Sequence, residues 1–275
     1  MRLLRLWRLY AWLDLAWMMR DLASFAVFLF ADGITVLSLV TAMLLLAQRF
    51  DGLGPWTQPQ ITFLLGYAVL VRGLLDTFFG YNIAFISRRI GRGQLDHVLV
   101  QPQPIWMTLL TEGFSPAAGA PILLSGIGLM VWGSATLGLS LSPAWIGLFL
   151  LNVLSSASIV LSFTYVIGSL AFWAPHAAEE INSSSWRLIH QLGNFPLDGL
   201  AAVFIGGLLT VVPVGFVAWF PSRALLGLDL PWYAVWLTPL AALVFGAIAL
   251  FVFTRGMLHY GRTGSQRYLA YGHRR

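Results

Sequence analysis

The chain has no cysteine and no lysine, and it has few charged residues of any kind. All 16 basic residues are arginine, and only 10% of the 275 residues are charged. Without cysteine there can be no disulfide and no thiolate metal site. Without lysine there can be no P-loop, because that phosphate-binding turn needs a lysine to reach the β- and γ-phosphates. The scarcity of charge also argues against a soluble domain, in which about 25% of residues are charged.

Apolar residues make up 58% of the chain, and the mean hydropathy is +0.78. A soluble protein of this composition would aggregate through its apolar surface, whereas a bilayer solvates that surface. The apolar runs are each near the ~20 residues that a helix needs to cross a bilayer. We therefore expect an all-α polytopic membrane protein, a single domain over 1–275. We place six spans at 23–47, 61–86, 116–137, 145–172, 200–220 and 233–254.

The first twenty residues differ from the later apolar runs. Arg2, Arg5 and Arg8 follow helical spacing, and tryptophan and tyrosine, which favour the headgroup level, lie among them. This pattern predicts a helix over 2–20 that lies in the membrane interface. The alternative is an N-terminal extension of the first span.

The arginine distribution orients the spans, because arginine is enriched in cytoplasmic loops. One side collects the arginines of the N-terminus, of the loop after the second span and of a tail over 255–275, together with Arg187. The other side has only Arg49 and Arg223. This asymmetry predicts an even number of spans and cytoplasmic termini. It assigns the net charge of +5 to topology and not to nucleic-acid binding.

The most informative segment follows the second span. Arg88, Arg89 and Arg92 lie where the chain leaves the membrane, and Gly91 and Gly93 loosen the backbone. A short amphipathic stretch and two Gln-Pro pairs come next. From the residues alone, this segment is either a positively charged topogenic loop or a short helix that docks on a cytoplasmic partner.

Three stretches carry a family resemblance. The run over 90–102, Ile-Gly-Arg-Gly-Gln-Leu-Asp-His-Val-Leu-Val-Gln-Pro, resembles the I-x-x-G-x-L-D-x-x-L-x-x-P signature of ABC-2 type permeases. The stretches 194–223 and 253–265 resemble the family's Y-P-L … I-P-x-x-F-x-x-x-x-P and G-L-x-x-Y-x-S-x-G-S regions. Phe195 departs from the second pattern and 261–263 from the third. The resemblance covers nearly the whole chain.

The resemblance implies the permease subunit of an ATP-driven exporter in the inner (cytoplasmic) membrane. It implies that a second permease chain, identical or homologous, completes the translocation path. ATP and Mg²⁺ would bind to two separate ATP-binding subunits, so that this chain has no cofactor, metal or catalytic residue. The loop after the second span would be the coupling helix that meets the ATPase, through Arg88, Arg89, Gly91, Arg92, Gly93, Leu95, Asp96, Leu99 and Pro102. The alternative is a secondary transporter or channel that acts without an ATPase.

Prolines and charged residues within or next to the predicted spans also indicate local structure. Pro213 and Pro221 would shape an outer hairpin of short helices between the last two spans. Arg72 and Asp76 share one helix face, either as a polar patch in the translocation path or dimer seam, or as a self-neutralising pair. Asp32 would belong to the same path as a proton or ligand site, or would mark a break between the interfacial helix and the first span.

Glycines in two of the spans and an amphipathic segment after the fourth span also predict structure. Glycines in the third and fifth spans predict close helix packing, at Gly126, Gly128, Gly133, Gly206 and Gly207. The segment 176–198 forms either a cytoplasmic-side helix or a solvated connector.

Overall fold

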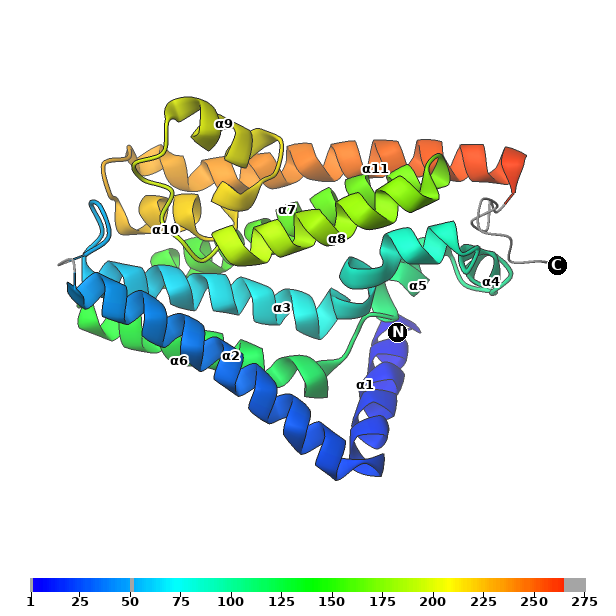
Figure 1. The fold of residues 1–275 in the computed structure, drawn as a ribbon, viewed down its shortest axis with the longest axis horizontal. Coiled ribbons are helices and arrows are strands. Elements are labelled where there is room, and N and C mark those ends of the chain that lie inside the picture. Colours follow the sequence, from blue (N-terminus) through cyan, green and yellow to red (C-terminus); the bar gives the residue numbers. More distant parts are fainter. Residues whose placement is uncertain (1, 50–51, 265–275) are drawn as a thin grey trace.

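The computed structural model describes residues 2–49 and 52–264, with the side chains of all of these except residues 2 and 81–84. Long helices run side by side (Figure 1), and no strand occurs in these residues beyond an isolated bridge between Leu53 and Trp56. Both ends of the described chain lie at one end of the bundle, together with α4 and α5. We name this the inner end, and the opposite end, which holds α9 and α10, the outer end.

Five helices are long and apolar enough to cross a membrane. They are α2 (Leu22–Arg49), α3 (Gln58–Gly91), α6 (Pro116–Thr136), α7 (Pro143–Ser169) with the 3-10 turn η1 (Leu170–Phe172), and α11 (Leu237–Thr263) after the 3-10 turn η3 (Trp232–Trp236). All but one of the predicted spans fall on these helices. The prediction of an all-α polytopic membrane protein is confirmed. Of the predicted tail over 255–275, the first part continues α11, and residues 265–275 lie outside the described residues.

The prediction of a single span over 200–220 is wrong. The chain there divides into α9 (Ala202–Thr210), the 3-10 turn η2 (Val214–Phe216) and the start of α10 (Trp219–Leu226), which lie together at the outer end (Figure 1). Pro213 stands between α9 and η2, where it lacks the amide hydrogen that a continuous helix requires. We name α9, η2 and α10 the outer hairpin.

A less apolar helix, α8 (Pro175–Leu192), returns the chain from the inner end towards the outer end. It packs against α3 and α7. The segment 176–198 is therefore helical over most of its length and packed on the bundle, and it is not a solvated connector. Arg187 lies within α8 and not in a loop.

The N-terminal helix α1 (Arg2–Arg20) meets α2 at an angle (Figure 1). The break falls at Asp21, whose carboxylate accepts hydrogen bonds from the amide and the hydroxyl of Ser24 (3.0 and 2.6 Å) and so caps α2. From there α2 continues through Asp32 without interruption. A continuous first span that includes α1 and a break at Asp32 are therefore both wrong.

The side of α1 that faces the bundle is held by polar contacts. The carboxylate of Asp14 accepts hydrogen bonds from the amides of Ala117 and Ala118 in the first turn of α6 (2.9 and 3.4 Å). A carboxylate at this end of a helix is favoured by the helix dipole. Trp12 and Trp17 of α1 are exposed, as is typical of a helix in the membrane interface.

Helices α3 and α6 touch backbone to backbone at glycines that recur every seven residues. They are Gly119, Gly126 and Gly133 on α6, and Gly66 and Gly73 on α3. A Cβ added at Gly126 would lie 2.5 Å from the backbone nitrogen of Leu70. Small residues allow helices in membranes to approach this closely. Close packing is confirmed at Gly126 and Gly133, whereas it is wrong for Gly128, Gly206 and Gly207, beside which a Cβ would find open space.

Candidate functional site

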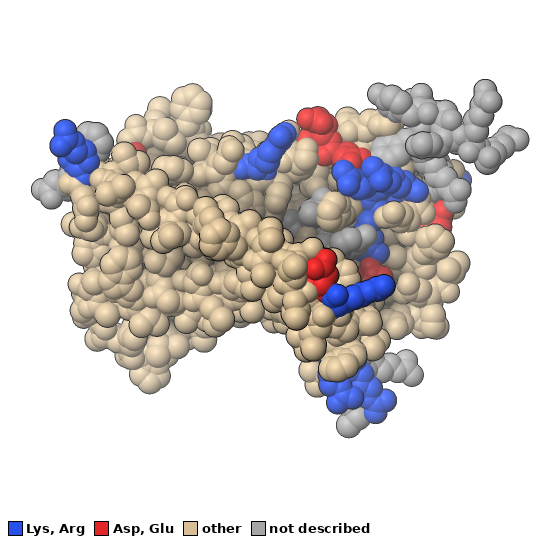
Figure 2. Space-filling view, turned by 60° about the horizontal axis from the view of Figure 1, so that its bottom comes forward, with Lys and Arg blue, Asp and Glu red and all other residues tan. Residues whose placement is uncertain are grey.

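Charged side chains gather at the inner end on the face seen in Figure 2, and the middle and outer parts of that face are nearly without them. Two short helices at this end connect α3 to α6: α4 (Leu95–Leu99) and α5 (Ile105–Thr111). Gly93 turns the chain from α3 into α4 with a φ of +69°, a conformation that favours glycine. We name the segment from Arg92 to Thr111 the elbow.

The elbow turns one face of α4 into the bundle. Leu95 and Val98 are buried, in an apolar cluster with residues of α3, α5, η1, α8 and α11: Ile86, Ile90, Leu109, Phe172, Ala178 and Tyr260. On the opposite side Leu99 is 44% exposed, and Val100, directly after α4, is 82% exposed. The elbow thus has one face that anchors it and one apolar face that is open.

The nine residues predicted to meet an ATPase do not share one surface. Arg92, Leu99 and Pro102 are exposed, as are His97 and Val100, which the prediction did not include. The other six are buried or half-buried: Arg88, Arg89, Gly91, Gly93, Leu95 and Asp96. The structure places this second group where it positions the elbow on the bundle.

Two ion pairs fasten neighbouring elements to the inner end of α3. Arg89 pairs with Glu112, the residue that follows α5, and the two side chains are only 7% and 18% exposed. Arg88 donates from Nε to a carboxylate oxygen of Glu179, the fifth residue of α8 (2.7 Å). Tyr10 of α1 lies near the first pair. Burial, and to a smaller extent the negative charge of Glu112, raises the pKa of the Tyr10 phenol above its usual value.

A hydrogen bond joins the elbow to α11. The hydroxyl of Tyr260 donates to Oδ1 of Asp96 at 2.5 Å, although the two residues are 164 positions apart. The Tyr260 ring is buried and packs edge-on against Phe172, with 5.7 Å between ring centroids. The motif regions 90–102 and 253–265 therefore meet in one contact.

Charged residues also meet halfway along the bundle. Nε of Arg72 lies 3.4 Å from a carboxylate oxygen of Asp76 on α3, and the side chains are 31% and 26% exposed. Asp32 on α2 is half-buried and lies within electrostatic reach of Asp76. The three residues predicted to share a polar patch are thus brought together by two helices.

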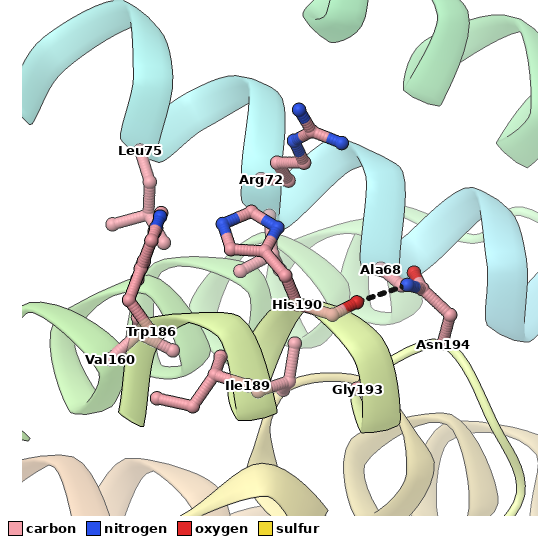
Figure 3. Close-up of a pocket in the computed structure, with 11 residues that line it drawn as sticks. Ala68, Arg72, Leu75, Val160, Trp186, Ile189, His190, Gly193 and Asn194 are labelled. Carbon is pink, nitrogen blue, oxygen red and sulfur yellow. Dashed lines mark hydrogen bonds between the residues drawn. The ribbon is translucent and has the colours of Figure 1, made fainter. Parts of the chain in front are cut away.

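A small cavity lies beside Arg72, between α3, α7 and α8. Its volume is about 20 Å³, which is room for about one water molecule. Figure 3 shows the imidazole of His190 next to the Arg72 side chain, with Trp186 along the same wall. The side-chain amide of Asn194 donates to the carbonyl of His190 (2.6 Å) just beyond the end of α8.

A polar network closes the outer end around Asp198, which lies between α8 and α9. Its Oδ2 accepts hydrogen bonds from the indole N–H groups of Trp56 and Trp219 (2.5 and 2.7 Å), and its Oδ1 accepts one from Arg223 (3.0 Å). Trp56 precedes α3, whereas Trp219 and Arg223 belong to α10. Asp198 therefore holds the outer hairpin against the start of α3. Pro221 is buried in the first turn of α10, where a missing amide hydrogen is tolerated.

The family model of ABC-2 family transporter proteins matches residues 33–264, from α2 to the end of α11. The chain belongs to the ABC-2 transporter family. It is accordingly an ABC-type permease and a multi-pass membrane protein. No curated protein and no solved structure matches it. The match includes the elbow, α8 and the outer hairpin of this ABC-2 permease, and it leaves out α1.

Three features of the ABC-2 permease escaped the reasoning from sequence: the path of α8, the Asp96–Tyr260 bond and the Asp198 network. A signal for α8 was visible, since polar residues recur every three or four positions from 176 to 191. No local signal marks the other two, because the partners are far apart in the chain.

Proposed function

We propose that this ABC-2 chain is the permease subunit of an exporter in the cell (inner) membrane. ATP is hydrolysed, with Mg²⁺, on two separate ATP-binding subunits, and a second permease chain completes the path. The observation that carries the proposal is the elbow, which presents an open apolar face at the inner end while its other face is fixed to several helices.

The open face of the elbow has the chemistry of a docking surface. Leu99, Val100 and Trp106 are 44%, 82% and 60% exposed, and the elbow also exposes the cation Arg92. Apolar and aromatic residues with an arginine are typical of the centre of a protein–protein interface. We therefore expect the ATPase to offer an apolar groove with an acidic rim.

The anchored face of the elbow explains how a movement of the ATPase would reach the membrane. Asp96 connects the elbow to α11, and Glu112, the residue directly after the elbow, pairs with Arg89 of α3. Packed interiors resist compression and so transmit displacement. A displacement of the elbow would therefore shift helix ends, and would not be absorbed within a loose loop.

The translocation path is proposed to pass the polar patch in the middle of the bundle. Charged groups at this depth avoid lipid and face a partner or a water-filled space. Arg72, Asp76 and Asp32 are partly exposed in the single chain, on the side where α2 and α3 meet. A second permease chain placed over this side would cover them.

The test is a pull-down of the tagged chain from its native membranes. Wild-type protein is expected to bring an ATP-binding subunit with it, whereas Val100→Asp is expected to bring at least about tenfold less, since a charge in an apolar contact costs more than about 1.4 kcal/mol. The matched control is Val211→Asp, because Val211 is 71% exposed at the outer end. The proposal is wrong if no ATPase accompanies the wild type, or if both variants retain it equally.

A further inference from the structure

Helix α8 runs along α3 from the inner end towards the outer end. At the inner end Arg88 of α3 meets Glu179 of α8, and farther along Arg72 lies beside His190. The chain then continues to Asp198, which bonds Trp56 at the start of α3. Together, α8 and the segment after it cover α3 over most of its length. Even so, α8 is not one of the five helices that are apolar enough to be recognised as spans.

The reason is that α8 has two different faces. Its buried face packs on α3 and α7 through residues such as Ala178 and Ile189. Its exposed face carries six polar residues that recur every three to four positions along the whole helix, with two adjacent serines in the middle: His176, Glu180, Ser183, Ser184, Arg187 and Gln191. We name these six the polar stripe. Beside it, Ile181 is 43% exposed and Ala177 is also open.

A stripe of this kind does not face lipid. Charged side chains at the depth of a bilayer are costly and face a partner or water, and the stripe contains both Glu180 and Arg187. The lipid-facing side of α11 has the opposite character, with Leu243 and Leu250 exposed at 72% and 70%. The bundle therefore has an apolar surface along α11. Along α8 it has a polar surface that is stable only against water or a polar partner.

A cavity at the inner end of the stripe indicates that this side of α8 contacts water and not only a polar partner. It has a volume of about 360 Å³, which is room for several water molecules. Ser87 and Arg88 of α3 line it, together with four residues of α8: His176, Glu179, Glu180 and Ser183. Three of those four belong to the polar stripe. The stripe therefore begins in a polar hollow at the inner end of the bundle, which is the geometry of a hydrated mouth.

We propose that the polar stripe of α8 lines a water-filled passage, closed on its far side by the second permease chain, and that the cargo is a hydrophilic solute. This inference rests on the proposed function as a permease. The stripe offers donors and acceptors of both signs, such as Arg187 and Glu180, in place of the hydrogen bonds that a polar solute loses on leaving water. A lipid-like cargo would lose its apolar contacts along such a wall.

The natural absence of cysteine provides the test. Single cysteines are introduced at Ser183, Ser184 and Gln191 on the stripe. Leu250→Cys on α11 is the lipid-facing control, and Ser156→Cys is the buried control, since Ser156 is 0% exposed. The cysteine thiolate attacks the thiosulfonate, so that a mixed disulfide forms and a sulfinate leaves, and the thiolate itself forms only where water reaches the thiol. Vesicles are treated with a sulfonatoethyl, a trimethylammonioethyl and a long-alkyl thiosulfonate, so that the reagents represent hydrophilic anions, hydrophilic cations and lipid-like molecules.

The stripe cysteines are expected to react with both charged reagents at least about tenfold faster than Leu250→Cys and Ser156→Cys. They are also expected to react faster with the charged reagents than with the long-alkyl reagent. Rates as low as those of the two controls would mean that the stripe is buried in a dry interface or in lipid, and the inference would be wrong. A faster reaction with the alkyl reagent would overturn the hydrophilic cargo.

The same variants are tested for ATPase co-purification, which separates this inference from the proposed function. Retention of the ATPase with unreactive stripe cysteines overturns only the hydrated passage. Loss of the ATPase from the wild type overturns the proposed function, whatever the labelling rates.

Discussion

The contact between α3 and α6 yields a prediction with a control on the same helix. Gly126 and Gly128 are both on α6, two residues apart, but only Gly126 faces α3. A methyl group added at Gly126 would lie 2.5 Å from the nitrogen and 2.6 Å from the Cα of Leu70, whereas a methyl group at Gly128 would find nothing within 4 Å. The perturbation is therefore Gly126→Ala, with Gly128→Ala as its control.

The magnitude follows from the geometry. Ordinary van der Waals contacts begin near 3.4 Å, so α3 and α6 would have to separate by about 0.9 Å at Leu70. A gap of this size removes roughly a quarter to a half of the dispersion energy of each affected contact. Overpacking of this kind lowers the free energy of unfolding by about 1–3 kcal/mol. Alanine also favours the helix over glycine by up to about 1 kcal/mol, but both variants gain this equally.

We therefore expect Gly126→Ala to be less stable than Gly128→Ala by about 1–3 kcal/mol. The assay is reversible unfolding in mixed micelles with increasing sodium dodecyl sulfate, followed through the fluorescence of the 12 tryptophans. The midpoint of Gly128→Ala should equal or exceed that of the wild type, and the midpoint of Gly126→Ala should fall below it. If Gly126→Ala unfolds at the same detergent fraction as Gly128→Ala, the backbone contact between α3 and α6 does not exist.

Three more predictions concern polar contacts. Tyr260→Phe removes the hydrogen bond to Asp96 and should lower the free energy of unfolding by about 1.5–3 kcal/mol; in an Asp96→Ala background, which has no acceptor at this position, the same change should lower it much less, and equal effects in both backgrounds would contradict the contact. Glu112→Ala leaves the buried Arg89 without its carboxylate and should destabilise the protein by about 3–5 kcal/mol in the detergent titration; a loss below about 1 kcal/mol would show the pair to be solvated. Asp198→Ala should free the outer hairpin from the start of α3, because each hydrogen-bond partner left without Asp198 costs about 1–3 kcal/mol. A protease added at the outer face should then cleave the hairpin about tenfold faster than in the wild type. An unchanged rate of cleavage would show that Asp198 does not hold the hairpin in place.

The sequence predicted the apolar helices well because a bilayer selects for uniform hydrophobicity along a span. It failed at α8 for the same reason, since hydropathy averages over both faces of a helix whose exposed face is polar. Hydropathy instead predicts a span over the apolar segment 200–220. That segment folds into α9, η2 and the start of α10, with Pro213 at the break. Composition alone does not distinguish an apolar hairpin from an apolar span.

In the candidate site too, some features were predictable from the sequence and others were not. The motif at 90–102 located the elbow and its exposed residues, because the motif is local. It did not indicate that Asp96 turns inward to Tyr260, since that contact joins residues 164 positions apart. The seven-residue recurrence of glycine on α6, by contrast, is visible in the sequence at Gly119, Gly126 and Gly133. Local patterns thus predict the elements, and the long-range polar contacts that fix their arrangement require the fold.

The strength of each contact at the inner end indicates which helices would move when the elbow is pushed. Helices α3 and α6 touch through backbone and have no flexible side chains between them at Gly126, so they should move as one body. By contrast, α8 meets the inner end of α3 through the small buried side chain of Ala178 and through the Arg88–Glu179 pair, whose side chains are 42% and 28% exposed. An exposed pair of this kind contributes about 0–1 kcal/mol. The helix with the polar stripe is therefore held there less firmly than the core, and a shift of α8 relative to α3 is the least costly way to widen or narrow a passage along it.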